Sequence, residues 1–99
     1  MAGTDAAGQR LDKWLWFARL TRTRSLAAKL VASGYVRVNS RRVTTPAKAI
    51  APGDVLTVAL HCQVRVLKVA SMGTRRGNPA EASHLFDDLA EARELERSS

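Results

Sequence analysis

The first third of the chain carries an apolar pattern with helical spacing. The apolar residues recur at i, i+3, i+4 and i+7, and they are Leu11, Trp14, Leu15 and Ala18. This spacing predicts a helix over residues 10–20 with one apolar face. Thr23 is a suitable N-cap for a second helix, which we expect over residues 24–33. In that second helix Leu26, Ala27, Leu30 and Val31 would share the buried face, and Gly34 could end it in the left-handed conformation.

The pattern changes to strand spacing after Gly34. Val36 and Val38 fall on one face and Arg37 on the other, which predicts a half-buried strand over residues 35–38. Asn39 and Ser40 then form a plausible two-residue hairpin turn, weaker than Asn-Gly because serine disfavours a positive φ. Residues 41–43 would return as a short strand. Further strands are expected over residues 55–60 and 64–69, so the sequence predicts an α+β fold in which two helices precede a small antiparallel sheet.

The last third of the chain predicts a C-terminal helix. Asn78 is a suitable N-cap, Pro79 fits the first helical position, and Glu81 stands three residues after the cap. The helix would extend to about residue 95, with an acidic outer face and an apolar stripe of Ala82, Leu85, Phe86 and Leu89. We therefore expect residues 1–9 to be disordered, 10–70 to form the domain, and 71–99 to be a basic loop and an amphipathic acidic helix.

Trp16 does not fit the single apolar face of the first helix. At 100° per residue, Trp16 and Leu20 lie nearly opposite that face. Three interpretations stay open at this point: Trp16 stacks on an RNA base, anchors a partner, or is covered by the C-terminal helix. We favour the third, with Leu85, Phe86 and Leu89 lying over Trp16 and Leu20, because two apolar stripes would otherwise face water.

The charge of the chain is concentrated in its first three quarters. The 99 residues include 16 Lys and Arg and 9 Asp and Glu, for a net charge of +7. Residues 10–76 hold fourteen basic and two acidic side chains, a net +12, whereas residues 81–99 carry a net −4. Such a surface attracts polyanions through counterion release, and arginine, which outnumbers lysine, matches the geometry of phosphate. A nucleic-acid ligand is the favoured interpretation, and a solvated basic surface or a membrane-surface binder is the alternative.

The basic residues are predicted to gather at the junction of the two helices and the hairpin. The expected ridge consists of Arg22, Arg24, Lys29, Arg37, Asn39, Arg41 and Arg42. Further candidate RNA-binding residues are Arg10, Lys13, Thr23, Lys48, Arg75 and Arg76. Each arginine taken singly could be ordinary solvated surface, but no acidic residue is interleaved between Lys13 and Ala51. We expect Arg24→Ala and Arg42→Ala to weaken RNA binding without unfolding the domain.

Catalysis has little support in the sequence. The obvious nucleophile or metal candidates are His61, Cys62 and His84, and their spacing resembles no zinc site. The chain also lacks a glycine-rich phosphate loop. We therefore expect no enzymatic activity, no cofactor and no metal.

A DNA-binding helix-turn-helix protein is the second alternative. Its second helix would enter the major groove, where side chains read base edges. Here that helix would expose Ser25, Ala28, Lys29 and Ala32, which read bases poorly. The basic groups follow on the strand instead, which favours RNA.

The remaining sequence features concern location and assembly. No run of eighteen apolar residues exists, and the N-terminus does not resemble a signal peptide. The single cysteine, Cys62, excludes an internal disulfide and fits a reducing compartment. We expect a cytoplasmic protein that does not bind membranes and is a monomer in isolation.

The run RLDKWLWFARLTRTRSLAAKLVASGYVRVN resembles a known RNA-binding domain, the S-four domain, named after the fourth protein of the small ribosomal subunit. RLDKWLW, the TR before the second helix and GYVRVN resemble its heat shock protein 15 branch in particular. Pro46, the run from Gly53 to Leu56 and the region from Arg75 to Ala82 match that branch as well. The resemblance extends from about Arg10 to Phe86.

This resemblance implies an αL-type arrangement of two helices followed by a sheet, and binding to structured ribosomal or transfer RNA. For the heat shock protein 15 branch it implies binding to the large ribosomal subunit when a nascent chain on transfer RNA is stranded, a role in rescue and quality control of stalled translation. Two departures matter. Ser40 stands where the family commonly has glycine, and the expected acidic helix stands in place of the long basic tail of some members.

Overall fold

The computed structural model describes residues 8–60, 63–74 and 76–89. The described chain begins with strand β1 (Gln9–Arg10) and helices α2 (Leu11–Phe17) and α3 (Arg24–Ala32). Strands β2 (Val36–Val38), β3 (Arg41–Val43), β4 (Ala49–Ile50), β5 (Val55–Ala59) and β6 (Val64–Val69) follow. Helix α4 (Pro79–Ala82), the 3-10 turn η1 (Ser83–Leu85) and strand β7 (Phe86–Asp88) complete it.

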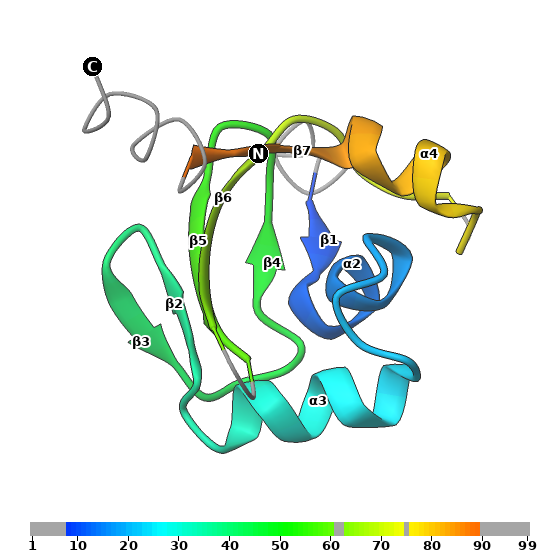
Figure 1. Ribbon diagram of the computed structural model, residues 1–99. Coiled ribbons are helices and arrows are strands. Elements are labelled where there is room, and N and C mark those ends of the chain that lie inside the picture. The colour runs from blue at the N-terminus through cyan, green and yellow to red at the C-terminus, as the bar shows by residue number, and fades with distance from the viewer. Residues whose placement is uncertain (1–7, 61–62, 75, 90–99) are drawn as a thin grey trace.

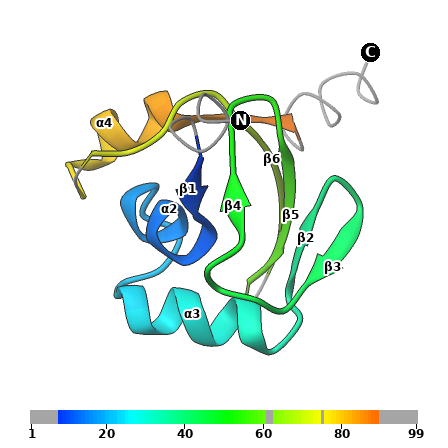
Figure 2. The ribbon, with the colours of Figure 1, turned by 180° about the vertical axis from the view of Figure 1, so that it is seen from behind.

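The strands of the described residues form one larger sheet and one small pair. The larger sheet has five strands in the order β3-β2-β5-β6-β7, and each neighbouring pair is antiparallel. The small pair is β1 with β4. In both views α3 lies at the end of the domain opposite β7 and α4, and the β2–β3 hairpin extends beside the C-terminal end of α3 (Figures 1 and 2). The predicted α+β class, with two helices before an antiparallel sheet, is confirmed.

Helix α2 buries the apolar face that its spacing predicted. Leu11, Trp14 and Leu15 have no exposed surface, and Ala18 is 3% exposed. The helix ends at Phe17, earlier than the expected residue 20, because Arg19 takes a left-handed φ of 63°. That turn directs the chain toward α3.

Helix α3 begins as predicted. The Thr23 hydroxyl accepts a hydrogen bond from the backbone N–H of Leu26 at 3.1 Å, so Thr23 is the N-cap. Beyond the helix, Gly34 has a φ of +84°, the left-handed conformation expected of it. The buried face is narrower than predicted, since Ala27 and Val31 are buried but Leu26 is 48% exposed.

The β2–β3 hairpin turns on Asn39 and Ser40. Their φ values are 52° and 72°, which is the type I′ turn that matches the twist of the strands. Val36 and Val38 face the core, at 0% and 6% exposure, and Val38 pairs with Arg41 across the hairpin. The register predicted from alternation is therefore confirmed.

The long C-terminal helix expected to residue 95 is wrong for the described residues. Asn78 does cap the helix, accepting from the N–H of Glu81 at 2.8 Å, but α4 ends at Ala82. Phe86 to Asp88 instead form strand β7, in which Phe86 pairs with Val69 of β6. The edge of β6 needs hydrogen-bonding partners, and strand pairing supplies them where a helix would not. The rest of the expected helix, residues 90–95, lies outside the described residues.

The C-terminal segment packs on the domain, but against Trp14 and not against Trp16. The Phe86 ring meets Trp14 edge-on, with centroids 6.2 Å apart, whereas Trp16 stacks on Phe17 at 5.4 Å. Leu85 and Phe86 belong to the side chains that pack against the core, and so does Leu20. The expectation that the tail lies over Trp16 as a helix is therefore replaced by a strand that covers Trp14.

Regular structure begins at Gln9, one residue before the predicted start of the domain at residue 10. Gln9 lies in β1, and its side-chain amide donates to the carbonyl of Gly73 at 2.7 Å and accepts from the N–H of Gly73 at 3.0 Å. Gly73 in turn lies so close to Phe17 that an added Cβ would stand 2.6 Å from the ring. Residues 1–7, the rest of the segment expected to be disordered, lie outside the described residues.

The turn of the hairpin leads to a stability prediction. Ser40 holds a φ that glycine adopts without strain, so Ser40→Gly should raise the free energy of unfolding by up to about 1 kcal/mol. Ser33→Gly is the matched control: Ser33 has an ordinary helical φ of −81°, so it should be neutral or destabilising. Thermal unfolding measures both, and a lower melting temperature for Ser40→Gly would contradict the type I′ geometry.

Candidate nucleic-acid interface

The exposed cations of the domain differ in whether a protein group neutralises them. Ion pairs involve Arg10, Arg24 and Arg65 among the described residues. No ion pair or side-chain hydrogen bond within the described part of the chain involves the exposed residues Arg22, Lys29, Arg37, Arg41, Arg42 and Lys48. These six side chains come from the α2–α3 junction, α3, the β2–β3 hairpin and the segment after it, and all six were predicted as RNA-binding residues. We call them the free-cation edge.

The hairpin places two of these cations directly opposite each other. Arg37 of β2 and Arg42 of β3 are paired in register, so their side chains share the sheet face opposite Val36 and Val38. Like charges facing each other across a strand pair destabilise it unless something neutralises them. In the described structure neither arginine of this pair has an acidic partner, so the two positive charges face each other without neutralisation.

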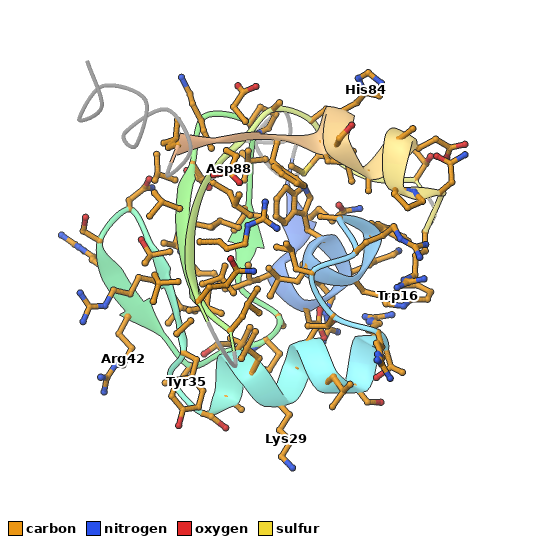
Figure 3. The ribbon with its side chains drawn as sticks, in the orientation of Figure 1. Trp16, Lys29, Tyr35, Arg42, His84 and Asp88 are labelled. Carbon is orange, nitrogen blue, oxygen red and sulfur yellow. The ribbon has the colours of Figure 1, made fainter. Side chains whose placement is uncertain are left out.

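The arginine at position 42 also lies against the end of α3. A Cβ added to Gly34 would stand 3.4 Å from Cδ of Arg42, so the guanidinium group lies over the glycine backbone. Figure 3 shows Lys29, Tyr35 and Arg42 directed outward along the same edge of the molecule. Arg41 projects to the other face, where it lines a shallow pocket with Lys48. The edge thus has cations on both faces of the hairpin.

Two predicted site residues share a buried carboxylate. Asp12 is 3% exposed and accepts from the guanidinium of Arg10 at 3.1 Å, while Nε of Arg24 stands 3.8 Å from its second oxygen. Arg24→Ala would remove one of the two cations beside this buried charge, which costs stability. The side chain of Arg24 is 43% exposed and can also meet a ligand, so the effect of Arg24→Ala on RNA binding stays a prediction, with a loss of stability expected beside it.

The side-chain amide of Asn39 forms hydrogen bonds from the hairpin turn to the start of β5. Its side-chain oxygen accepts from the N–H of Val55 at 2.9 Å, and its amide nitrogen donates to Asp54 at 3.1 Å. The structure thus gives Asn39 a role in joining β2 to β5. Thr23 likewise caps α3 through its hydroxyl.

Two further predicted site residues, Lys13 and Arg76, have contacts at α2 and at the α2–α3 junction. The ammonium of Lys13 stands 5.6 Å from the centroid of the Phe17 ring. Arg76 donates weakly to the carbonyl of Thr21 at 3.4 Å, which brings its segment to the α2–α3 junction. Arg75 lies outside the described residues.

Tyr35 was not among the predicted site residues. Its side chain is 56% exposed beside Arg37 and Arg42. Position 35 precedes Arg37 by two, so strand alternation places both side chains on the outer face. That spacing, together with an aromatic side chain at the start of a strand, is the signal that could have identified it.

The candidate metal ligands and nucleophiles of the sequence are His61, Cys62 and His84. Among the described residues there is no group of three or more His, Cys, Asp or Glu side chains that could hold a metal ion. His84 is exposed in η1, whereas His61 and Cys62 lie outside the described residues. No helix in the described ranges is long and apolar enough to cross a membrane.

Comparison with known proteins identifies the family. A family model described as the S4 domain, the S-four domain of the sequence resemblance, matches residues 9–56. The trimeric structure of Vibrio cholerae heat shock protein 15 is 32% identical to this chain, has a TM-score of 0.81 and covers 93% of both chains. The chain belongs to the heat shock protein 15 family. The predicted family is confirmed, and with it the RNA-binding S4 domain.

Curated members of the heat shock protein 15 family are longer than this chain. The Escherichia coli K12 protein is 35% identical over 83 residues, which are 84% of this chain and 62% of that protein. The chain therefore spans about three fifths of the length of this relative. The small ribosomal subunit protein uS4 of Staphylococcus haemolyticus is 45% identical over 49 residues, 50% of this chain and 24% of that protein. The similarity to uS4 thus extends over about the length of the S4 domain match.

The free-cation edge yields a mutational prediction with a charge-matched control. Arg42→Ala should weaken binding of a base-paired RNA hairpin about fivefold to tenfold, as expected for one charge-assisted contact of about 1 kcal/mol or more. Lys68→Ala removes the same charge from exposed Lys68 of β6, whose cross-strand partner in β7 is the acidic Asp87, and should change affinity less than twofold. Filter binding at fixed salt compares the two. Equal losses would show that only net charge matters, and that the edge is not the interface.

Proposed function

We propose that this chain binds structured ribosomal RNA through the free-cation edge of its S4 domain. The observation that carries the proposal is the cross-strand pair of Arg37 and Arg42, two like charges with no acidic partner among the described residues. A phosphate between them would remove their repulsion and form charge-assisted hydrogen bonds. Lys29 from α3 and Arg41 and Lys48 from the far face of the hairpin extend the positive surface along an RNA backbone.

Within this proposal, the RNA is that of the large ribosomal subunit, with transfer RNA as a further partner. The support is membership of the heat shock protein 15 family, which the sequence resemblance associates with rescue and quality control of stalled translation. Such a ligand implies a cytoplasmic location. The similarity to uS4, named as a small-subunit protein, makes the small subunit the competing site.

A DNA ligand is the alternative that the structure favours less. The exposed residues of α3 are Arg24, Ser25, Leu26, Lys29 and Ala32. Only Arg24 and Lys29 among them are side chains that read base pairs in a major groove, and Arg24 already lies within ion-pair distance of Asp12. The free cations lie mainly on the hairpin beside α3, where they would contact phosphates. Absence of catalysis and a monomeric state in isolation remain predictions, and the trimer described for the Vibrio cholerae protein is the alternative state.

Salt dependence tests the proposed phosphate contacts. If the six side chains of the free-cation edge each neutralise about one phosphate, log K against log salt should fall with a slope of about −4 to −5. Reversing two charges, with Arg37→Glu and Arg42→Glu together, should make the slope shallower by roughly two. The measurement is fluorescence anisotropy of a labelled RNA hairpin across a salt series. A slope near zero for the wild-type protein would contradict phosphate-dominated binding.

Co-sedimentation tests the choice of ribosomal subunit. The protein should pellet with purified large subunits and not with small subunits at the same salt concentration. The Arg37→Glu, Arg42→Glu double variant is the control, and it should stay in the supernatant in both cases. Preferential pelleting with the small subunit would refute the large-subunit proposal and favour a uS4-like site.

A further inference from the structure

The outer face of the hairpin holds a shallow pocket that phosphate contacts alone do not explain. Gly34, Ala59 and Val64 line it, together with Tyr35, Arg37 and Arg42. Two of its lining side chains are large and apolar yet exposed, Tyr35 at 56% and Val64 at 58%. The pocket thus combines an apolar surface with two cations.

Tyr35 is held firmly by its backbone while its ring stays open to solvent. Its N–H donates to the carbonyl of Leu30 at 3.2 Å, and its carbonyl accepts from the N–H of Ala59 at 2.9 Å. These bonds fix Tyr35 between the end of α3 and the last residue of β5. Its side chain makes no hydrogen bond with the described residues. An exposed, positioned aromatic ring of this kind is a stacking surface that loses little entropy on binding.

The two arginines stand on the same sheet face as this ring. Arg37 follows Tyr35 by two positions, and Arg42 is the cross-strand partner of Arg37. The missing side chain of Gly34 lets Arg42 lie against the backbone that joins α3 to Tyr35. Figure 3 shows Tyr35 and Arg42 next to each other at the lower edge of the molecule.

We propose that this pocket takes one unpaired nucleotide of the bound RNA. The base stacks on Tyr35 and lies against the apolar surface of Ala59 and Val64, and its phosphate lies between Arg37 and Arg42. A flat π-face joined to an anion is the ligand that an exposed ring beside two unneutralised guanidinium groups fits. This inference rests on the proposed RNA-binding function and deepens it, since it adds a preference for RNA with a bulged or looped-out nucleotide.

The pocket should accept any of the four bases. Apart from the two arginines, its side-chain polar groups are the hydroxyls of Tyr35 and Thr57. Among the described residues, no carboxylate or amide side chain lines the pocket to read a base edge. Stacking tolerates every base because each has a π-face, so the preference concerns the shape of the RNA and not its sequence.

The test uses two RNA hairpins that differ by one nucleotide. One is fully paired, and the other carries a single bulged 2-aminopurine in the same stem. The wild-type protein should bind the bulged hairpin at least about fivefold more tightly, the lower limit for one stacked base, and should quench the 2-aminopurine fluorescence. Tyr35→Ala should lose both the preference and the quenching, while Tyr35→Phe should keep both because the ring remains.

Leu26→Ala is the matched control, because it also removes an exposed large apolar side chain, here one that lies on α3 outside the pocket. It should leave the preference unchanged. If the Tyr35→Ala variant kept the full preference for the bulged hairpin, or if Leu26→Ala lost it equally, the proposed nucleotide pocket would be wrong. Equal wild-type binding of both hairpins would also overturn it and leave the proposed function standing. Binding of neither hairpin would refute the proposed function and this inference together.

Discussion

The register of β2 between β3 and β5 is the constraint on which the surface of this domain depends. Val36 and Val38 are buried because they pair with Val58 and Leu56 of β5, which are also fully buried. A shift of one residue would turn both valines to solvent and both neighbouring cations toward the core. The hairpin turn and the hydrogen bonds of Asn39 to Asp54 and Val55 fix this register from the other end. The positions of Arg37, Arg41 and Arg42 follow from it.

Two buried groups hold the helices against this sheet. The indole N–H of Trp14 donates to the carbonyl of Ser71 at 3.0 Å, which ties α2 to the segment after β6. Asp12, beside the start of α2, brings Arg24 at the start of α3 within ion-pair distance. The C-terminal end of α3 then lies beside the hairpin, as both views show (Figures 1 and 2). Lys29 and Tyr35 therefore join the hairpin arginines in one surface.

The sequence predicted those parts of the fold whose pattern is local. The apolar spacing of α2, the cap at Thr23, the glycine at 34 and the alternation of β2 each depend on a few neighbouring residues. The helix predicted for the C-terminal segment was wrong, because local apolar spacing does not show that Phe86 to Asp88 pair with the distant edge of β6. The strands β1 and β4 were missed for the same reason, since a two-residue pair has no period of its own.

The sequence selects the candidate site as a set of cations, and the structure shows which of them the fold engages. Charge alone selects cations, but it cannot tell which of them the fold neutralises. Arg10 and Arg24 share Asp12. Arg10 stands two residues before Asp12 in the chain, whereas Arg24 stands twelve residues after it and reaches it only because α2 packs on α3. Asn39 was selected for its amide, which the fold uses to join two strands. Tyr35 was passed over because its exposure depends on how α3 ends.

We propose that RNA contacts the edge formed by α3 and the β2–β3 hairpin. Backbone amide shifts in a titration with the bulged RNA hairpin test this contact most directly. The largest changes should fall on residues 29–43 and 57–59, with little change on β7. The largest changes on β6 and β7, with the hairpin unaffected, would contradict it.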